Sequence, residues 1–571
     1  MRICDFETGS LGRIASKYLI FLFVVPVGAL LLLRLSLSDL YFPLSNGDLL
    51  NTYKMQETFW QHRSFSNPKS GYPIGMDTRV WPYLDPLPSA LTGIFFLFTN
   101  NIILSVNLVF IFSFSICALV VWKISTEIGM SKTWKSLTVI MCVSIPWIPG
   151  RVEHFDFTYI SLSLLPLAIY LRKSSNNRDI VSMSIAGIAC GLTNPYLAVF
   201  AALNLTLAGA HYLLTRGIGK KTIQILFGIT SCFVGMIASL AISTYGYKGE
   251  IFPGFHRSLN ESVNLAGYIF VLLSPVEGTQ SGVISSVLPS SNLLGIEKEP
   301  TMKSNFGSWL LAAAFIVIIV LACRIYMAKL EISNSTETVN KNKKELLYLF
   351  LFLIAGNTIF FLKGGIGILL SASGFSFIRS WNRLTPIIQT LIIIAAVFFI
   401  QNWTNWGRKF WFRVALSILL ISQLQAFTTL SPNPKKQQQI EAQNYVNQIS
   451  IFVKPPCGIL QGPQISYPQN GNYFKMHDYD PFILQLTRND FEWSYGNPKN
   501  SQISSKIQID EMNNSSLQAK RFCGVSLDTF GTNSDEIYKK LVEIYGEPSV
   551  LSSSKRYVFF MVLGESFETT R

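Results

Sequence analysis

The chain has 571 residues, of which 49% are hydrophobic and only 14% are charged, and its mean hydropathy is +0.34. Soluble domains carry about 25% charged residues, so this composition excludes an ordinary soluble protein and indicates a polytopic membrane protein. The net charge of +14 does not indicate nucleic-acid binding. The basic residues are scattered through short loops and form no stripe with interleaved aromatic residues.

Apolar segments long enough to cross a bilayer alternate with polar loops along the first 430 residues. They cover residues 18–37, 101–122, 136–149, 159–171, 180–194, 196–215, 222–243, 307–323, 346–362, 384–401 and 410–428. This pattern predicts an all-α domain of about 11 transmembrane helices. Short pairs such as 136–149 and 159–171 also fit half-embedded hairpins, so both arrangements remain open at this stage.

The distribution of lysine and arginine sets the orientation of these helices. With a cytoplasmic N-terminus, every short Lys/Arg-rich loop falls on the cytoplasmic side, as the positive-inside rule requires. The long segments 38–87, 246–306 and 430–571 are then extracytoplasmic. The first apolar run follows basic residues but precedes no small-residue cleavage site, so we expect it to remain as a membrane helix.

The composition changes at residues 431–439, which are rich in proline, lysine and glutamine. We therefore expect a transmembrane domain at 1–430 and an extracytoplasmic domain at 431–571. The expected helices of the second domain are 439–452 and 534–545, and its expected strands are Gly458–Leu460, Val525–Leu527 and Tyr557–Leu563. These elements predict a small α+β domain of about 140 residues, a common size for one core.

Cysteine usage divides the chain in the same way. Six of the eight cysteines lie in or inside the membrane without the spacing of metal ligands, and we expect them to pack as small apolar residues. Cys457 and Cys523 lie in the outer tail, where an oxidising compartment permits a disulfide. The sequence does not fix the distance between them, so the bonded and free states both remain open.

A charged segment, Arg151-Val152-Glu153-His154-Phe155-Asp156, interrupts two apolar runs. Ionisable residues beside a bilayer are costly and usually functional. By the topology above, this segment shares the outer face with Asp48, Arg379 and Arg383, and the two last would face the same way on a helix. The outer face therefore carries the candidate site. Alternatively, the segment is a satisfied ion-pair network, and the arginines anchor a helix end by snorkelling.

The first outer loop places Asp48 just beyond the first membrane helix. A carboxylate there can accept a proton from a hydroxyl group while chemistry proceeds at the membrane surface. Asp48 follows Asn46-Gly47, so it fits equally well the N-cap of a helix after a turn. The residues expected to support this site are Asp77, Arg79, Trp81, Asp85 and Trp381. Both tryptophans could stack on a sugar, but interfacial anchoring is the more general role at this depth.

Two further outer segments are candidates for substrate contacts. Residues 473–493 are dense in aromatic and acidic side chains, among them Tyr479, Asp480 and Trp493, which fit a lip that binds an acceptor. A loop packed on its own α+β core fits the same composition. The segment 246–306 is long for a compact protein and predicts a functional loop, such as a lid over a bound carrier.

A carboxylate directly after the first membrane helix, many further spans and an outer tail domain resemble the layout of the GT-C superfamily. These integral membrane glycosyltransferases take a sugar from a polyprenyl-phosphate carrier on the outer face. More narrowly, the chain is similar to a little-characterised bacterial family labelled as sugar translocases or glycosyltransferases. The matching stretches are Tyr72-Pro73-Ile74-Gly75-Met76-Asp77, Asp85-Pro86-Leu87, Gly150-Arg151-Val152-Glu153-His154-Phe155, Leu165-Pro166-Leu167, Asn194-Pro195-Tyr196, Phe377-Ile378-Arg379 with Arg383, and Trp493-Ser494-Tyr495-Gly496.

The resemblance implies sugar transfer from a polyprenyl-phosphate-linked donor to a glycan or lipid acceptor of the cell envelope, at the outer face of a bacterial inner membrane. Its catalytic base matches Asp48, with Glu153 and His154 as positioning groups. Some GT-C relatives carry an Asp-Glu pair at this point, whereas Leu49 follows Asp48 here, so Asp39, Asp77 and Asp85 remain alternatives for the base.

The departing phosphate of such a donor needs cations. The planar guanidinium group donates two hydrogen bonds at once and stays charged, so we expect Arg151, Arg379 and Arg383 to bind the phosphate. Direct displacement assisted by one carboxylate base implies inversion at the anomeric carbon.

The sequence indicates no obligate cofactor. It has no compact His/Asp ligand motif, although a divalent metal held by His154 with Asp48 or Asp156 remains an open alternative. No glycine-rich phosphate loop is present, which argues against nucleotide-driven chemistry. The alternative functions are a flippase or transporter of lipid-linked sugars and a glycan polymerase or ligase. Transporters usually have inverted repeats and midplane charges, and neither emerges clearly in this sequence.

Overall fold

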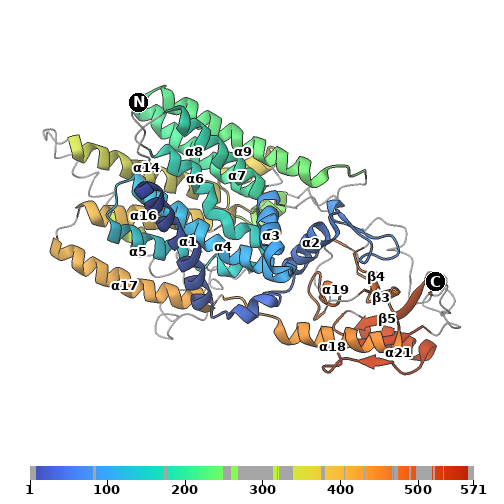
Figure 1. The fold of residues 1–571 in the computed structure, drawn as a ribbon. Coiled ribbons are helices and arrows are strands. Elements are labelled where there is room, and N and C mark those ends of the chain that lie inside the picture. Colours follow the sequence, from blue (N-terminus) through green and yellow to red (C-terminus); the bar gives the residue numbers. More distant parts are fainter. Residues whose placement is uncertain are drawn as a thin grey trace, which may run out of the picture.

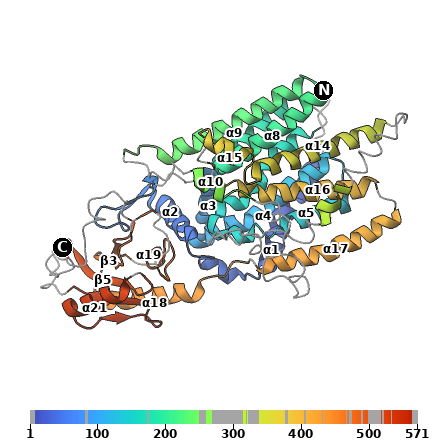
Figure 2. The ribbon, with the colours of Figure 1, turned by 180° about the vertical axis from the view of Figure 1, so that it is seen from behind.

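The computed structural model describes residues 8–80, 85–172, 176–248, 259–267, 313–317, 319–320, 338–374, 378, 380–403, 406–429, 431–465, 467–468, 474–487, 490–496, 517, 521–531 and 533–562. Long helices form one bundle, and a small sheet with its helices lies at one end of it (Figure 1). The reverse view gives the same arrangement, with α2 between the bundle and the sheet (Figure 2).

The bundle consists of apolar helices. They are α1 (Thr8–Leu33), α4 (Ile102–Glu127), α5 (Lys132–Val143), α7 (Asn177–Thr193), α8 (Pro195–Arg216), α9 (Lys220–Thr244), α14 (Thr338–Phe361), α16 (Thr385–Trp403) and α17 (Trp406–Thr429), with the shorter α6 (Leu165–Tyr170), α10 (Leu259–Asn264) and α15 (Ile366–Ala372). Among the described residues, five segments are long and apolar enough to cross a membrane: Ile102–Glu127, Pro195–Arg216, Lys220–Thr244, Asn342–Phe361 and Trp381–Asn402. The chain is therefore a multi-pass membrane protein.

The helices differ in how far they are buried inside the bundle. In α4, 78% of the most apolar window is buried, whereas the corresponding value for α9 is 33%, so α9 presents much of its apolar surface to lipid. Small residues let α7 and α9 approach closely. A Cβ atom at Gly191 would lie only 2.3 Å from the backbone nitrogen of Met236. This close packing is a common way for membrane helices to associate without a hydrophobic driving force.

The structure departs from the expected spans in two places. The expected outer loop 38–87 contains α2 (Asp48–His62) and ends at a further apolar helix, α3 (Pro86–Thr99), which the sequence pattern missed. Two prolines at its start suggested a loop, but proline is well tolerated in the first helical turn. The expected span 159–171 is a 3₁₀ segment, η3 (Pro149–Leu164), followed by the short α6. Most of the expected span 307–323 lies outside the described residues.

The C-terminal part contains a mixed five-stranded sheet in the order β4-β3-β5-β7-β6. Its strands are β3 (Gly458–Gly462), β4 (Glu492–Trp493), β5 (Phe522–Asp528), β6 (Val550–Leu551) and β7 (Tyr557–Met561), accompanied by α18 (Lys436–Phe452), α19 (Phe482–Gln485) and α21 (Ser534–Tyr545). Strand β3 pairs in parallel with β4 and β5, and β7 pairs antiparallel with β5 and β6. Leu460, Val525 and Phe560 are among the residues of its core, and Ile537 and Leu541 of α21 pack there as well.

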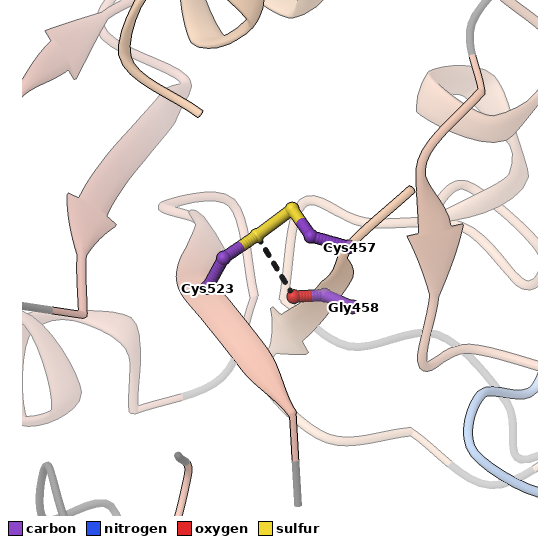
Figure 3. Close-up of a disulfide and its surroundings, with 3 residues drawn as sticks. All are labelled: Cys457, Gly458 and Cys523. Carbon is purple, nitrogen blue, oxygen red and sulfur yellow. Dashed lines mark hydrogen bonds between the residues drawn. A yellow bond between two sulfur atoms is a disulfide. The ribbon is translucent and has the colours of Figure 1, made fainter. Parts of the chain in front are cut away.

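A disulfide and a buried ion-pair cluster stabilise this part. A disulfide joins Cys457 and Cys523, whose Cα atoms are 6.0 Å apart, where the neighbouring strands β3 and β5 begin (Figure 3). Arg556 is buried between two carboxylates, 2.8 Å from Asp480 and 2.8 Å from Asp528. Asp480 was expected to bind an acceptor. Its side chain is instead 1% exposed and is held by this ion pair, so the structure gives it a role in stability.

Backbone hydrogen bonds join the C-terminal part to the first outer loop. The amide of Tyr72 donates to the carbonyl of Trp493 at 2.9 Å, and the amide of Trp493 donates to the carbonyl of Lys69 at 2.9 Å. The Tyr467 hydroxyl donates to Asn51 Oδ1 on α2 at 3.1 Å. The loop therefore extends the edge of the sheet beyond β4, and the aromatic segment after β3 lies against α2.

Candidate active site

The central contact of the candidate site is between Asp48 and His154. Helix α2 begins at Asp48, and the preceding Gly47 has φ 68°, a conformation that glycine adopts readily. Gly47 is the N-cap, so Asp48 is not the cap that the turn-and-helix alternative predicted. Its Oδ2 atom lies 3.0 Å from Nδ1 of His154, and the two side chains are 34% and 28% exposed. A carboxylate and an imidazole from distant segments thus meet at the surface.

Glu153 contacts the same turn. The Ser45 hydroxyl donates to Glu153 Oε1 at 3.0 Å, three residues before Asp48. The backbone of η3 is irregular here, since Arg151 and His154 have non-helical angles. Consecutive residues of η3 therefore hold the turn that starts α2, which fixes the position of Asp48 from two sides.

Two carboxylates, Asp85 and Asp156, lie near the Asp48–His154 contact. Asn194 caps the N-terminus of α8, where its Oδ1 accepts a hydrogen bond from the Tyr196 amide at 2.8 Å. Its Nδ2 donates to Asp156, and it also bonds to Asp85. Burial and the negative charge of Asp156 raise the pKa of Asp85 well above its usual value. Burial also raises the pKa of Asp156, which the charges of His154 and Arg383 oppose.

Arg383 approaches the site from the segment before α16. Its side chain is 8% exposed, and its guanidinium lies 3.9 Å from the ring centroid of Phe157 and 4.5 Å from that of Tyr196. The Tyr196 hydroxyl accepts a hydrogen bond from the Ser380 amide at 3.3 Å. Two aromatic faces therefore hold a cation close to Asp156.

The expected helical relation between Arg379 and Arg383 lies partly outside the described residues. The 3₁₀ turn η6 (Trp381–Leu384) begins after Ser380, whose angles of φ −105° and ψ 77° are not helical. Arg379 itself lies outside the described residues, as does Trp81. Only residues 246–248 and 259–267 of the expected lid are described.

Arg151 and the pair Asp77 and Arg79 each have further contacts. Arg151 is 6% exposed, and its guanidinium is 5.5 Å from the ring centroid of Trp147. Arg79 forms an ion pair with Asp77 at 2.7 Å and donates to the Tyr245 carbonyl at 3.0 Å. The Asp77–Arg79 pair thus links the first outer loop to the end of α9.

The aromatic residues expected to contact substrates have different surroundings in the structure. Trp381 is 1% exposed and donates to the Ser371 hydroxyl at 3.1 Å, so its ring faces are covered and cannot stack on a sugar. Trp493 is also 1% exposed, because it lies in β4 under the first outer loop. Tyr479 is close to the site. Burial raises its pKa, and the negative charge of Asp48 adds to this effect.

No group of three or more His, Cys, Asp or Glu side chains with the geometry of a metal site occurs among the described residues. The sequence reasoning missed Phe157, Asn194 and Tyr196 as parts of the site. The available signal was a polar residue and a proline between two apolar runs, Asn194-Pro195, on the same face as the charged segment in the expected topology.

The fold and these contacts define a multi-pass membrane protein in which an aspartate at the start of α2 contacts a histidine of η3. No family model matches the chain, and no curated protein does. Several solved structures are similar, among them the following three. Arabinofuranosyltransferase AftD from Mycobacteria has a TM-score of 0.47 and 12% identity, covering 95% of this chain and 40% of AftD.

Archaeal oligosaccharyltransferase AglB from Archaeoglobus fulgidus, in complex with an inhibitory peptide and a dolichol-phosphate, has a TM-score of 0.44 and 14% identity, covering 93% of this chain and 71% of AglB. ArnT from Cupriavidus metallidurans, bound to undecaprenyl phosphate, has a TM-score of 0.46 and 12% identity, covering 98% of each chain. All three are GT-C glycosyltransferases, the superfamily that the sequence resembles. Because every TM-score is below 0.5, the function proposed below rests on this chain's own residues.

Proposed function

We propose that the protein is a membrane glycosyltransferase of the GT-C type. It transfers a sugar from a polyprenyl-phosphate-linked donor to a glycan or lipid acceptor of the cell envelope. The observation that carries this proposal is the 3.0 Å contact between Asp48 and His154, which joins the first outer loop to the charged segment of η3. The cation of Arg383 beside Asp156 supports it, because the departing phosphate needs positive charge in the same site.

In the proposed reaction, the Asp48 carboxylate accepts the proton of an acceptor hydroxyl. The hydroxyl oxygen attacks the anomeric carbon of the donor, the bond from this carbon to the phosphate oxygen breaks, and polyprenyl phosphate leaves. Attack opposite the leaving group inverts the anomeric carbon. His154 and Glu153 position Asp48, since one contacts its carboxylate and the other holds the turn before it.

The positive charge for the phosphate comes from arginine in this proposal. Arg383 is the first candidate, because two aromatic rings hold its guanidinium in place. Arg151 and Arg379 remain part of the proposal as further phosphate ligands, and Asp77, Arg79 and Asp85 as supporting residues. Tyr479, whose pKa the charge of Asp48 helps to raise, is kept in the proposal as an acceptor contact, although it is 2% exposed and stacks on Phe482.

The proposed topology has about 11 spans, a cytoplasmic N-terminus and an extracytoplasmic α+β domain at 431–571, in a bacterial inner membrane. The positive-inside distribution of lysine and arginine supports this orientation. It also agrees with the chemistry, because a lipid-linked donor supplies activated sugar on a face without nucleotide sugars. Cysteine labelling from outside intact spheroplasts tests it, with Ser554→Cys expected to react and Thr215→Cys expected to be protected.

The transfer reaction is tested with purified protein in nanodiscs and a panel of radiolabelled polyprenyl-phosphate sugars, supplied with envelope lipid extracts. Transfer of label to an acceptor supports the enzyme. Movement of the labelled lipid across the bilayer without transfer would instead favour the flippase alternative. Addition of EDTA is expected to leave transfer intact. Loss that Mg²⁺ or Mn²⁺ restores would assign the charge stabilisation to a metal held by Asp48 and His154.

A further inference from the structure

A polar pocket lies on the side of α2 away from the candidate active site. Its volume is about 390 Å³, and this half-open hollow is lined by α2, the turn before α4, the end of α19 and the described residues that follow α19. Lys54, Glu57 and Gln61 line it from α2, Asn100 from the turn, and Asp490 from the C-terminal part. Most of its other lining side chains are also polar. Small-molecule sites are usually lined by apolar side chains, so this pocket fits a polar ligand.

The two lysines that are described in the pocket wall are paired with carboxylates. Lys54 Nζ lies 2.6 Å from Glu57 Oε2, and these side chains are only 4% and 15% exposed. At the rim, Lys69 Nζ lies 2.6 Å from Asp490 Oδ1. Burial lowers the pKa of His62 in the same pocket, so its imidazole is uncharged at neutral pH, with Glu57, Lys54 and Lys69 as its charged neighbours. Among the described lining residues, Lys54 and Lys69 thus each have a carboxylate beside them.

This arrangement selects among ligand classes. A phosphate or carboxylate ligand needs an excess of positive charge, which paired lysines do not supply. Ion pairs and amide groups present donors and acceptors side by side, and they match hydroxyl groups, which both donate and accept hydrogen bonds. We infer that this pocket binds a neutral saccharide unit of the acceptor, an inference that rests on the proposed glycosyltransferase function.

The position along α2 determines which unit of the acceptor binds there. Lys54 and Gln61 follow Asp48 in the same helix, so they lie about 9 and 20 Å from it along the axis at 1.5 Å per residue. The bound unit is therefore not the one that reacts. The pocket holds a remote unit of a longer acceptor, and its binding energy is used to place the reactive hydroxyl near Asp48.

Binding is tested directly on the full-length protein in nanodiscs. The probes are neutral glucan, mannan, galactan and arabinan oligosaccharides of increasing length, measured by saturation-transfer NMR and calorimetry. Gln61→Trp fills the pocket from an exposed helical position and is expected to weaken binding of the preferred oligosaccharide by about tenfold or more. Gln448→Trp, at an exposed position of α18 outside the pocket, is the matched control and should bind as the wild type does.

The outcomes separate this inference from the proposed function. Asp48→Asn should bind the oligosaccharide like the wild type, because Asp48 does not line the pocket. If no oligosaccharide binds, or if Gln61→Trp leaves binding unchanged, the pocket inference is overturned even where transfer is observed. If the protein binds the oligosaccharide, Gln61→Trp abolishes this binding and no transfer is detected, the saccharide site is supported and the proposed enzyme activity is refuted. Displacement of the oligosaccharide by millimolar inorganic phosphate or by anionic lipid vesicles would identify an anion site and overturn the inference.

Discussion

Replacement of Arg383 by methionine removes a charge while it keeps side-chain length and apolar packing. The guanidinium lies 3.9 Å from the Phe157 ring centroid and 4.5 Å from the Tyr196 ring centroid, and the side chain is 8% exposed. At about 2 kcal/mol for a desolvated cation over one ring, the two rings hold the cation with roughly 4 kcal/mol. A charge fixed in this way needs little reorganisation during the reaction. We therefore expect Arg383→Met to lower kcat by about 10²- to 10³-fold, the loss typical of one preorganised electrostatic group.

Arg383→Lys keeps the charge but loses the planar fork and the ring stacking, so its kcat should fall by a smaller factor, about tenfold. The assay is transfer from a labelled polyprenyl-phosphate sugar under saturating donor, with single-turnover measurements to isolate the chemical step. Arg413→Met is the matched control. Arg413 belongs to α17, outside the site, and its guanidinium lies 5.0 Å from the ring centroid of Trp134 in α5. Transfer by Arg383→Met within threefold of the control would refute the role of this cation.

Three further changes test stability. Arg556→Met leaves its two buried carboxylate partners without a cation and should destabilise the protein by about 3–5 kcal/mol. The loss should be smaller at acid pH, where the carboxyls are protonated. A melting temperature equal to that of the wild type at neutral pH would contradict this prediction. The folded-state pKa of Asp85 is raised by burial, so the stability that this carboxyl contributes is present below its unfolded pKa and is lost as pH rises through the folded value. Asp85→Asn should therefore raise the melting temperature at about pH 8 and change it little at about pH 4. A melting temperature that falls at about pH 8 would show that the ionised carboxylate stabilises the fold. Reduction of the Cys457–Cys523 bond, which closes a separation of 66 residues, should cost roughly 4 kcal/mol and lower the melting temperature, while Cys457→Ser should be insensitive to reductant.

The elements that follow from local composition agree with the structure. The expected helices 439–452 and 534–545 correspond to α18 and α21, because both carry buried apolar residues at helical spacing, α18 in the large core and α21 in the core with Leu460, Val525 and Phe560. The expected strand Tyr557–Leu563 begins where β7 begins. Helix α3 escaped notice, because the two prolines at its first turn are also typical of a loop.

The candidate site depends on contacts between distant segments, which composition cannot supply. The outer-face topology predicted that Asp48 and His154 share a side of the membrane, but only the fold brings them to 3.0 Å. Trp381 was assigned to the surface because tryptophan is frequent at membrane interfaces, whereas packing on Phe200 and Phe360 buries it. The Asn194-Pro195 pattern marks a break between two apolar runs but does not show which side chains Asn194 contacts. Its role as a bridge follows from the meeting of α8 with η3.

The most direct test of the proposed function compares sugar transfer by the purified wild type with transfer by Asp48→Asn. The asparagine keeps the size of the side chain and a hydrogen bond to His154 but cannot accept the proton of an acceptor hydroxyl. We expect transfer by the wild type and a loss of about 10²- to 10⁴-fold in the variant, the usual contribution of a general base, with its melting temperature unchanged. Transfer by a folded Asp48→Asn at the wild-type rate would contradict the assignment of Asp48 as the base.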